Sequence, residues 1–206
     1  MKSLLIKNAL LINEGKSQLA SVLVVGDTIS TVYTDDSYAD IEGHVDRVID
    51  ATGKWLLPGV IDDQVHFREP GLTHKADINT ESMAAVAGGV TSFMEMPNTK
   101  PPTITRDALD WKFARAAQTS LANYSFYTGA TNENIEEVLR ADYRRVCGVK
   151  VFMGSSTGNM LVDNADALSR IFSEAPALIA VHCEKEEIIK ANKQKYIEEF
   201  GENLPV

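Results

Sequence analysis

Residues 58–71 read Pro-Gly-Val-Ile-Asp-Asp-Gln-Val-His-Phe-Arg-Glu-Pro-Gly, and this stretch leads an apolar strand into a rigid polar turn. The Pro-Gly pairs that open and close it are typical of a short buried strand followed by a turn. Alternate side chains of a strand share a face, so Gln64, His66 and Arg68 are expected on one face and the apolar residues between them on the other. Burying an imidazole and a guanidinium together is costly without a functional partner. The end of this strand is therefore expected to carry chemistry.

Composition restricts the class of protein. The chain has 206 residues, 44% of them hydrophobic, and can bury a sizeable core. Its formal net charge of −9 argues against general binding of nucleic acid or of an anionic membrane. No run of about 18 apolar residues and no signal peptide is visible, which predicts a cytoplasmic protein that does not enter membranes. Cys147 and Cys183 form no CxxC pair and are not expected to form a disulfide.

The pattern of apolar residues changes along the chain. Residues 1–54 hold short alternating segments separated by turn formers, which predicts a small N-terminal β module without chemistry of its own. From residue 55 to 206, apolar strands alternate with helical stretches, which predicts a parallel sheet, open or closed into a barrel. Chemistry at several strand ends and the lack of a GxGxxG or P-loop motif favour the barrel. Strands are expected near residues 56–66, 91–96, 124–127, 149–153 and 178–182. Helices are expected near 76–87, 105–119, 134–141, 164–174 and 184–199, with Asn134 capping the third.

Two further strands carry polar residues of interest. Lys150 lies inside the apolar run Val149–Met153, where pattern alone favours a lysine whose stem is buried and whose ammonium reaches solvent. His182 ends the strand near 178–182, and its structural alternative is a histidine held by a backbone carbonyl. With His66, these residues place three candidate ligands at three strand ends. A shared metal ion explains all three, and nitrogen and oxygen donors suit zinc, with manganese or cobalt as replacements.

Four segments together carry a family resemblance. Residues 58–71, Met-Pro-Asn-Thr at 96–99, Gly-Val-Lys-Val-Phe-Met-Gly at 148–154 and Val-His-Cys-Glu at 181–184 follow one another as in the cyclic amidohydrolases. The ending Phe-Arg-Glu-Pro-Gly resembles dihydroorotase in particular. The resemblance implies an α/β fold, a (β/α)8 TIM-type barrel with a small N-terminal β-sandwich part. It also implies that His66, Lys150 and His182 bind zinc, with Lys150 N-carboxylated to a carbamate that bridges two ions.

The resemblance also implies a substrate. Arg68 and Asn98 would hold the carboxylate of dihydroorotate, while their structural alternatives are a salt bridge to Glu69 and a turn asparagine. Zinc would lower the pKa of its bound water toward about 7 and polarise the cyclic amide, which would open to N-carbamoyl-aspartate in pyrimidine biosynthesis. One departure matters: Gln64 stands where the family carries a metal-binding histidine. An amide is a weak zinc ligand, so the second of the two ions is in doubt.

Only five of the eight strand–helix units of such a barrel are visible before Val206. The chain is therefore expected to be a truncated or partial form, inactive alone. The resemblance places a further histidine ligand and a proton-shuttling aspartate after residue 206, so no catalytic residue beyond the metal-bound water is expected within the chain. A homo-oligomer, a dimer, is expected, with aspartate carbamoyltransferase as a candidate partner. The alternatives are a non-catalytic dihydroorotase-like scaffold and another cyclic amidohydrolase such as allantoinase.

Overall fold

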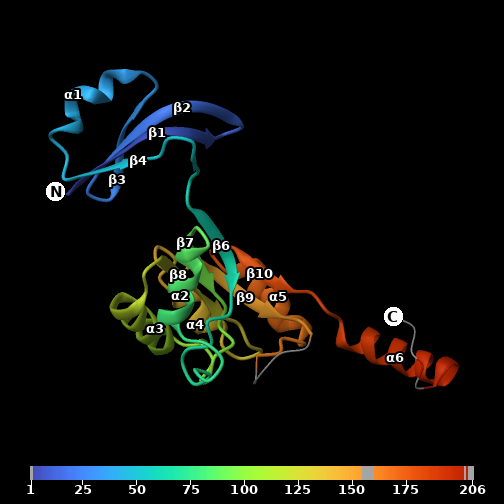
Figure 1. Ribbon diagram of the computed structural model, residues 1–206. Coiled ribbons are helices and arrows are strands. Elements are labelled where there is room, and N and C mark those ends of the chain that lie inside the picture. The colour runs from blue at the N-terminus through green and yellow to red at the C-terminus, as the bar shows by residue number, and fades with distance from the viewer. Residues whose placement is uncertain (1, 155–159, 202, 204–206) are drawn as a thin grey trace. The chain divides into compact units, whose positions relative to one another are not determined.

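The computed structural model describes residues 2–154, 160–201 and 203 (Figure 1). The chain divides into two compact units, Met1–Gly59 and Val60–Val206. Each unit contains its own five-stranded sheet, so each has its own architecture.

The first unit is built on one sheet in the order β3-β2-β1-β4, with β5 also paired to β1. Its strands are β1 (Ser3–Asn13), β2 (Lys16–Val25), β3 (Thr28–Tyr33), β4 (Arg47–Asp50) and β5 (Trp55–Leu56), and a 3-10 helix η1 (Asp36–Tyr38) and helix α1 (Ala39–Glu42) join β3 to β4. β1 and β2 form an antiparallel hairpin whose turn residues, Glu14 and Gly15, have φ of +49° and +73°. Positive φ at both positions matches the twist of a hairpin. The described residues of this unit form one sheet, not the two packed sheets of the expected β-sandwich.

The boundary between the units lies after Gly59, whereas the sequence pattern places it after residue 54. Trp55 and Leu56 pair in parallel with Leu10 and Leu11 of β1 and so belong to the first unit. The prediction of a single strand near 56–66 is therefore wrong, because β5 and β6 (Val60–Val65) lie in different sheets. Pro58 between them has no amide hydrogen with which to continue a ladder.

The second unit is a curled parallel sheet in the order β10-β9-β8-β7-β6 (Figure 1). After β6, its strands are β7 (Val90–Glu95), β8 (Asn123–Gly129), β9 (Gly148–Phe152) and β10 (Ile179–His182). A helix follows each strand: α2 (Ile78–Ala87), α3 (Arg106–Thr119), α4 (Ile135–Arg140), α5 (Ala165–Glu174) and α6 (Glu186–Phe200). The five predicted helices are confirmed, with ends that differ by one or two residues. Side-chain caps begin three of them, from Asp77, Thr105 and Asn164.

The predicted cap of α4 is wrong. Asn134 stands at the helix start, but its side chain makes no capping hydrogen bond. Its Oδ1 accepts from the Thr131 amide at 2.7 Å, and its Nδ2 donates to the carbonyls of Ile104 and Gly129 at 3.0 and 2.8 Å. The Asn134 side chain therefore faces back to the end of β8 and to the distant Ile104 instead of capping α4.

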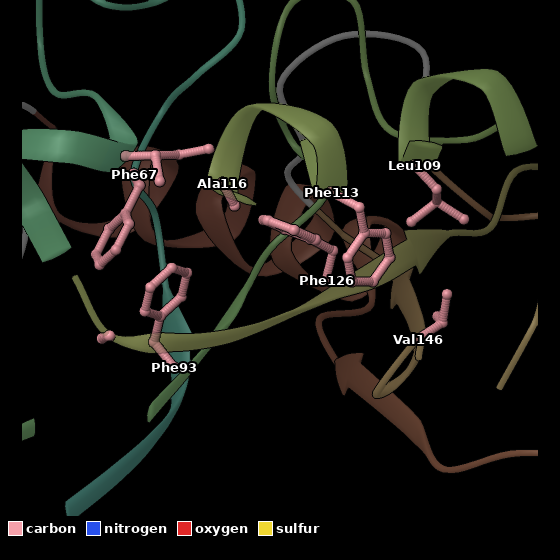
Figure 2. Packing of buried hydrophobic residues seen from close by; sticks show 9 residues of the cluster. Phe67, Phe93, Leu109, Phe113, Ala116, Phe126 and Val146 are labelled. Carbon is pink, nitrogen blue, oxygen red and sulfur yellow. The ribbon is translucent and has the colours of Figure 1, made fainter. Parts of the chain in front are cut away.

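Two apolar clusters fill the space between the sheet and its helices. The larger contains Phe67, Phe93, Phe113 and Phe126, with Phe67 and Phe93 ring centroids 4.5 Å apart and Phe113 edge-on to Phe126 at 5.0 Å (Figure 2). Edge and tilted contacts of this kind suit the charge distribution of aromatic rings. The smaller cluster contains Val149 and Val151 of β9, packed with residues of α4 and α5. Since side chains alternate along a strand, these contacts direct the intervening residues to the opposite, concave face of the sheet.

Candidate functional site

The candidate ligands share the carboxyl half of the parallel sheet. His66 directly follows β6, Lys150 is at the centre of β9 and His182 is the last residue of β10. Because Val65 and Phe67 pack into the larger cluster and Val149 and Val151 into the smaller one, His66 and Lys150 belong to the concave face. Val65 and Phe67 thus share the apolar face, as the predicted alternation requires. β6 and β10 are the two outer strands of the sheet, so His66 and His182 approach the concave face from opposite sides.

A hydrogen bond orients His66. Its Nδ1 lies 2.8 Å from Asn98 Oδ1, in the loop after β7. An amide oxygen only accepts, so Nδ1 carries the hydrogen and Nε2 presents a lone pair. Burial is the main cause that lowers the pKa of His66 below its usual 6.5, and the hydrogen bond to Asn98 opposes this shift. Nearby cations lower the pKa further: Arg68, Lys150 and Lys112. A neutral imidazole with one oriented lone pair is the form that binds a metal ion.

Lys150 is 4% exposed, and its Nζ lies 5.1 Å from the centre of the Phe152 ring. Within residues 2–154, 160–201 and 203, no carboxylate forms an ion pair with it. Burial lowers the pKa of Lys150, and the charge of Cys183 opposes the shift. The prediction from pattern alone, that the Lys150 ammonium reaches solvent, is therefore wrong. The structure instead buries an amine whose charged form is disfavoured.

His182 is tied to Glu184, because its Nε2 lies 3.1 Å from Glu184 Oε1. Its ring centre is 6.2 Å from that of Phe152, which places Phe152 beside both Lys150 and His182. Sequence reasoning missed the roles of Glu184 and Phe152. The spacing of two residues between His182 and Glu184 is the signal that pairs them, because residues i and i+2 share a side at a strand end.

Arg68 does not form the salt bridge that was its structural alternative. The carboxylate of Glu69 is occupied by Arg115 Nε at 2.8 Å and by the Ile78 amide, the first of α2, at 3.0 Å. Arg68 itself has φ of +67°, a backbone conformation that non-glycine residues rarely adopt. The part of the chain that the structure describes shows no ion pair for Arg68. Its side chain therefore remains available to an anion.

The loops after β6 and β7 touch, which brings Arg68 and Asn98 into one region. The Lys100 amide donates to the Pro70 carbonyl at 3.0 Å. Gly71 has φ of +79°, and a Cβ there would come within 1.8 Å of the Lys100 carbonyl oxygen. Only glycine fits this contact. The Pro-Gly pair that closes the first motif is thus required by the neighbouring loop.

The structure brings the predicted residues together in two groups. His66, Asn98 and Arg68 form one group, and Lys150 and His182 form the other around Phe152. Gln64 is exposed on β6, and its backbone amide donates to Asp62 Oδ1 at 3.1 Å. The described residues contain no cluster of three His, Cys, Asp or Glu side chains able to hold a metal ion. Within that part of the chain, His66 and His182 are therefore not joined by a third side chain of these types.

Two other features bear on the class of protein. Both cysteines are free, as the sequence predicts. Among the described residues, no helix has the length and apolar character needed to cross a membrane.

Known proteins resemble this chain along almost all of its length. Residues 53–192 match the model of the family described as dihydro-orotase-like. An L-hydantoinase of Paenarthrobacter aurescens is 34% identical over 98% of this chain and 44% of its own length. A dihydroorotase of Halobacterium salinarum is 41% identical over 66% of this chain and 33% of its own.

A solved structure agrees with the fold. The L-hydantoinase (dihydropyrimidinase) from Arthrobacter aurescens superposes with a TM-score of 0.87 at 30% identity, covering 98% of this chain and 45% of that one. The chain thus spans less than half the length of the relatives it matches. The match of the family model over most of the chain shows that this chain belongs to the dihydro-orotase-like family.

Proposed function

We propose that this site serves a dihydroorotase-type, metal-dependent and reversible hydrolysis of the cyclic amide of dihydroorotate to N-carbamoyl-aspartate, in cytoplasmic pyrimidine biosynthesis. The observation that carries the proposal is the position of Arg68. Its neighbour Glu69 is paired with Arg115, so the guanidinium lies beside the oriented His66 without an internal carboxylate. A planar guanidinium binds a substrate carboxylate through two parallel hydrogen bonds.

The charges around the site favour an anionic ligand. The positive groups Arg68 and Lys150 lie close enough to His66 to lower its pKa. Lys150 has no carboxylate partner among the described residues. A dicarboxylate product or a ring that carries one carboxylate offsets this positive charge, whereas a neutral ring does not.

The donor atoms fit a zinc ion. His66 presents Nε2, and His182 would offer Nε2 once a metal ion replaced its contact with Glu184. Lys150 becomes a ligand if its amine adds to carbon dioxide, with loss of a proton, to give a carbamate. Burial favours this reaction because it raises the share of neutral amine. When bound, zinc would supply Lewis-acid polarisation of the amide and an activated water.

The chain's own residues have separate tasks. Arg68 binds the carboxylate and sets the ring's position, and Asn98 holds the His66 tautomer. With its oxygen on His66, Asn98 reaches a substrate only through its amide nitrogen. Phe152 covers the buried Lys150 and limits water around it. Together these residues bind and orient the substrate, while the proton-shuttling aspartate is expected outside this chain.

The identity of Gln64 shapes the metal content that we propose. Gln64 is exposed and would contribute only a neutral amide oxygen. One ion is therefore expected to bind firmly and a second weakly or not at all. Elemental analysis of protein purified without chelator checks this, and two tightly held equivalents would contradict it.

The assembly around the site is also part of the proposal. We expect the curled five-stranded sheet to form part of a (β/α)8 barrel. Among the described residues, its outer strands β6 and β10 each pair with a strand on one side only. A homodimer and an association with aspartate carbamoyltransferase remain the expected quaternary contacts.

A second candidate is another cyclic amidohydrolase, of the hydantoinase or allantoinase type. The match to an L-hydantoinase over nearly the whole chain favours it. In that case Arg68 would not face a substrate carboxylate. The third candidate is a metal-free scaffold, which Gln64 favours.

Ligand binding separates these candidates. Calorimetry with dihydroorotate and with dihydrouracil, which lacks the carboxylate, compares two rings that differ in the charged group. A hydrogen-bonded charged pair is worth about 1.5–3 kcal/mol, so dihydroorotate should bind roughly 10 to 150 times more tightly. The variant Arg68→Met should remove that preference. Equal affinities for the two rings would refute the dihydroorotase assignment, and a protein that holds no zinc and binds neither ring would be a scaffold.

A further inference from the structure

A buried ion pair lies beneath the site and takes no part in the proposed chemistry. Lys112 of α3 and Glu95 at the end of β7 both have fully buried side chains, and Lys112 Nζ lies 2.5 Å from Glu95 Oε2. Neither Glu95 oxygen makes a hydrogen bond of good geometry, so the pair is held by charge and burial. Burial raises the pKa of Glu95 and lowers that of Lys112, and each partner opposes the shift of the other. Such pairs seldom increase stability over an apolar pair of similar volume.

The surroundings of this pair point to the turn that carries His66 and Arg68. Val65, the last residue of β6, is in register with Glu95 and accepts the Met96 amide at 2.9 Å. The backbone amides of Arg68 and Phe67 favour the ionised form of Glu95 and act to lower its pKa, after the larger effect of Lys112. Lys112 Nζ also lies 3.4 Å from the Met96 carbonyl. The pair thus lies next to the backbone of the turn after β6 and to the backbone at the end of β7.

The same helix face holds the turn at a second point. Arg115, one turn after Lys112 on α3, binds Glu69 Oε1 through Nε at 2.8 Å. Residues three apart on a helix lie on one side, so α3 directs Lys112 at Glu95 and Arg115 at Glu69 of the turn. Between these points, Arg68 keeps its positive φ of +67°. A non-glycine residue in this conformation costs about 1 kcal/mol or more and persists only when its surroundings hold it.

We propose that Lys112 and Glu95, together with Arg115 and Glu69, form a clamp from helix α3 that positions Arg68 and His66 for substrate binding. Lys112 and Glu95 are positioning residues, since both side chains are fully buried and act through the turn. The inference rests on the proposed function for its consequence, the binding of dihydroorotate. Its structural part, the conformation of the turn, stands apart from that function.

The variant Lys112→Met tests the clamp, because methionine keeps most of the lysine's length without the charge. In this variant Glu95 loses its counter-ion, and the turn should relax toward negative φ at Arg68. The resonances of Arg68 Nε–H and His66 Cε1–H should shift in the ligand-free protein, and dihydroorotate should bind at least tenfold more weakly. Leu109→Ala is the matched control: Leu109 is 4% exposed on the same helix and belongs to the larger apolar cluster. It should lower Tm comparably while both resonances and the affinity stay close to wild type.

A double variant covers the case in which Lys112→Met does not fold. Glu95→Leu with Lys112→Met removes both charges and restores an apolar interior, so Tm should recover. The clamp predicts that the two resonances and the affinity nevertheless stay altered. If both resonances and the affinity recover together with Tm in the double variant, the proposal is overturned and the pair is a purely structural feature. Changes in Leu109→Ala as large as those in Lys112→Met would overturn it as well. If wild-type protein binds no dihydroorotate, the proposed function fails, and the two resonances then decide the clamp by themselves.

Discussion

Removing the side chain that orients His66 should weaken zinc binding. In Asn98→Ala, the hydrogen bond of 2.8 Å between His66 Nδ1 and Asn98 Oδ1 is lost, and the ring is free to change tautomer and rotate. A neutral hydrogen bond contributes about 0.5–1.5 kcal/mol. Partners of metal-binding histidines typically change metal affinity by about 10- to 100-fold, or about 1.4–2.8 kcal/mol. The two ranges meet near 1.4 kcal/mol, so we expect a loss of about tenfold.

The assay is a competition between the protein and a chromophoric zinc chelator, without substrate, so that any contact of Asn98 with the substrate does not contribute. Asn98→Asp is the informative partner variant, because a carboxylate also accepts from Nδ1 and should retain or increase the affinity. Asn132→Ala is the control: its side chain bonds Asp163 at 2.9 Å and lies on another loop. Zinc affinity of Asn98→Ala within twofold of wild type would refute the reasoning, and His66 would then be oriented by other contacts.

Four other outcomes are expected. Arg68→Lys keeps the charge but loses the planar fork, so dihydroorotate should bind about tenfold more weakly in calorimetry, and unchanged affinity would make Arg68 structural. Burial raises the pKa of Cys147 to about 11, so at pH 8 only about 0.1% of it is thiolate, and a disulfide reagent should titrate exposed Cys183 first; equal rates would contradict this. Burial holds the pKa of His66 in the folded protein below 6.5, so protonation favours the unfolded chain. The contribution of neutral His66 to stability is full above pH 6.5 and declines as the pH falls through the folded pKa. An NMR titration of His66 checks this, and a midpoint above 6.5 would be the contrary result. The chain spans less than half the length of its relatives, and acid–base assistance is worth about 10² to 10⁴ in rate, so the 206-residue chain with added zinc should show no appreciable dihydroorotase activity; turnover at the rate of a full-length relative would contradict this.

Local patterns were sufficient to locate the helices of the second unit. Three of the five helices begin where Asp77, Thr105 and Asn164 supply caps, and capping depends on neighbours within three residues. The alternation of polar and apolar residues around His66 was also readable, because a strand repeats every two residues whatever its partners. These features needed no knowledge of which elements would meet.

The resemblance of four segments added what local patterns could not. It selected the family and the candidate ligands His66, Lys150 and His182, and the family is confirmed. The residue Gln64, which departs from the family pattern, was visible from sequence alone. Its consequence for the metal content stays a prediction.

Tertiary structure decided every contact between distant segments. Whether Glu69 pairs with Arg68 or with Arg115, 46 residues later, depends on how α3 packs against the turn. Trp55 and Leu56 resemble the start of the next strand but pair with β1, because a strand's partner lies far away in sequence and local pattern does not identify it. The pair of Glu95 and Lys112 reads in sequence as two ordinary charged residues, and becomes buried only when β7 and α3 enclose it. Sequence thus determined what each segment becomes, since propensity and alternation act within a few residues. Which charges meet was determined by packing, because an ion pair requires a closeness that only the folded chain provides.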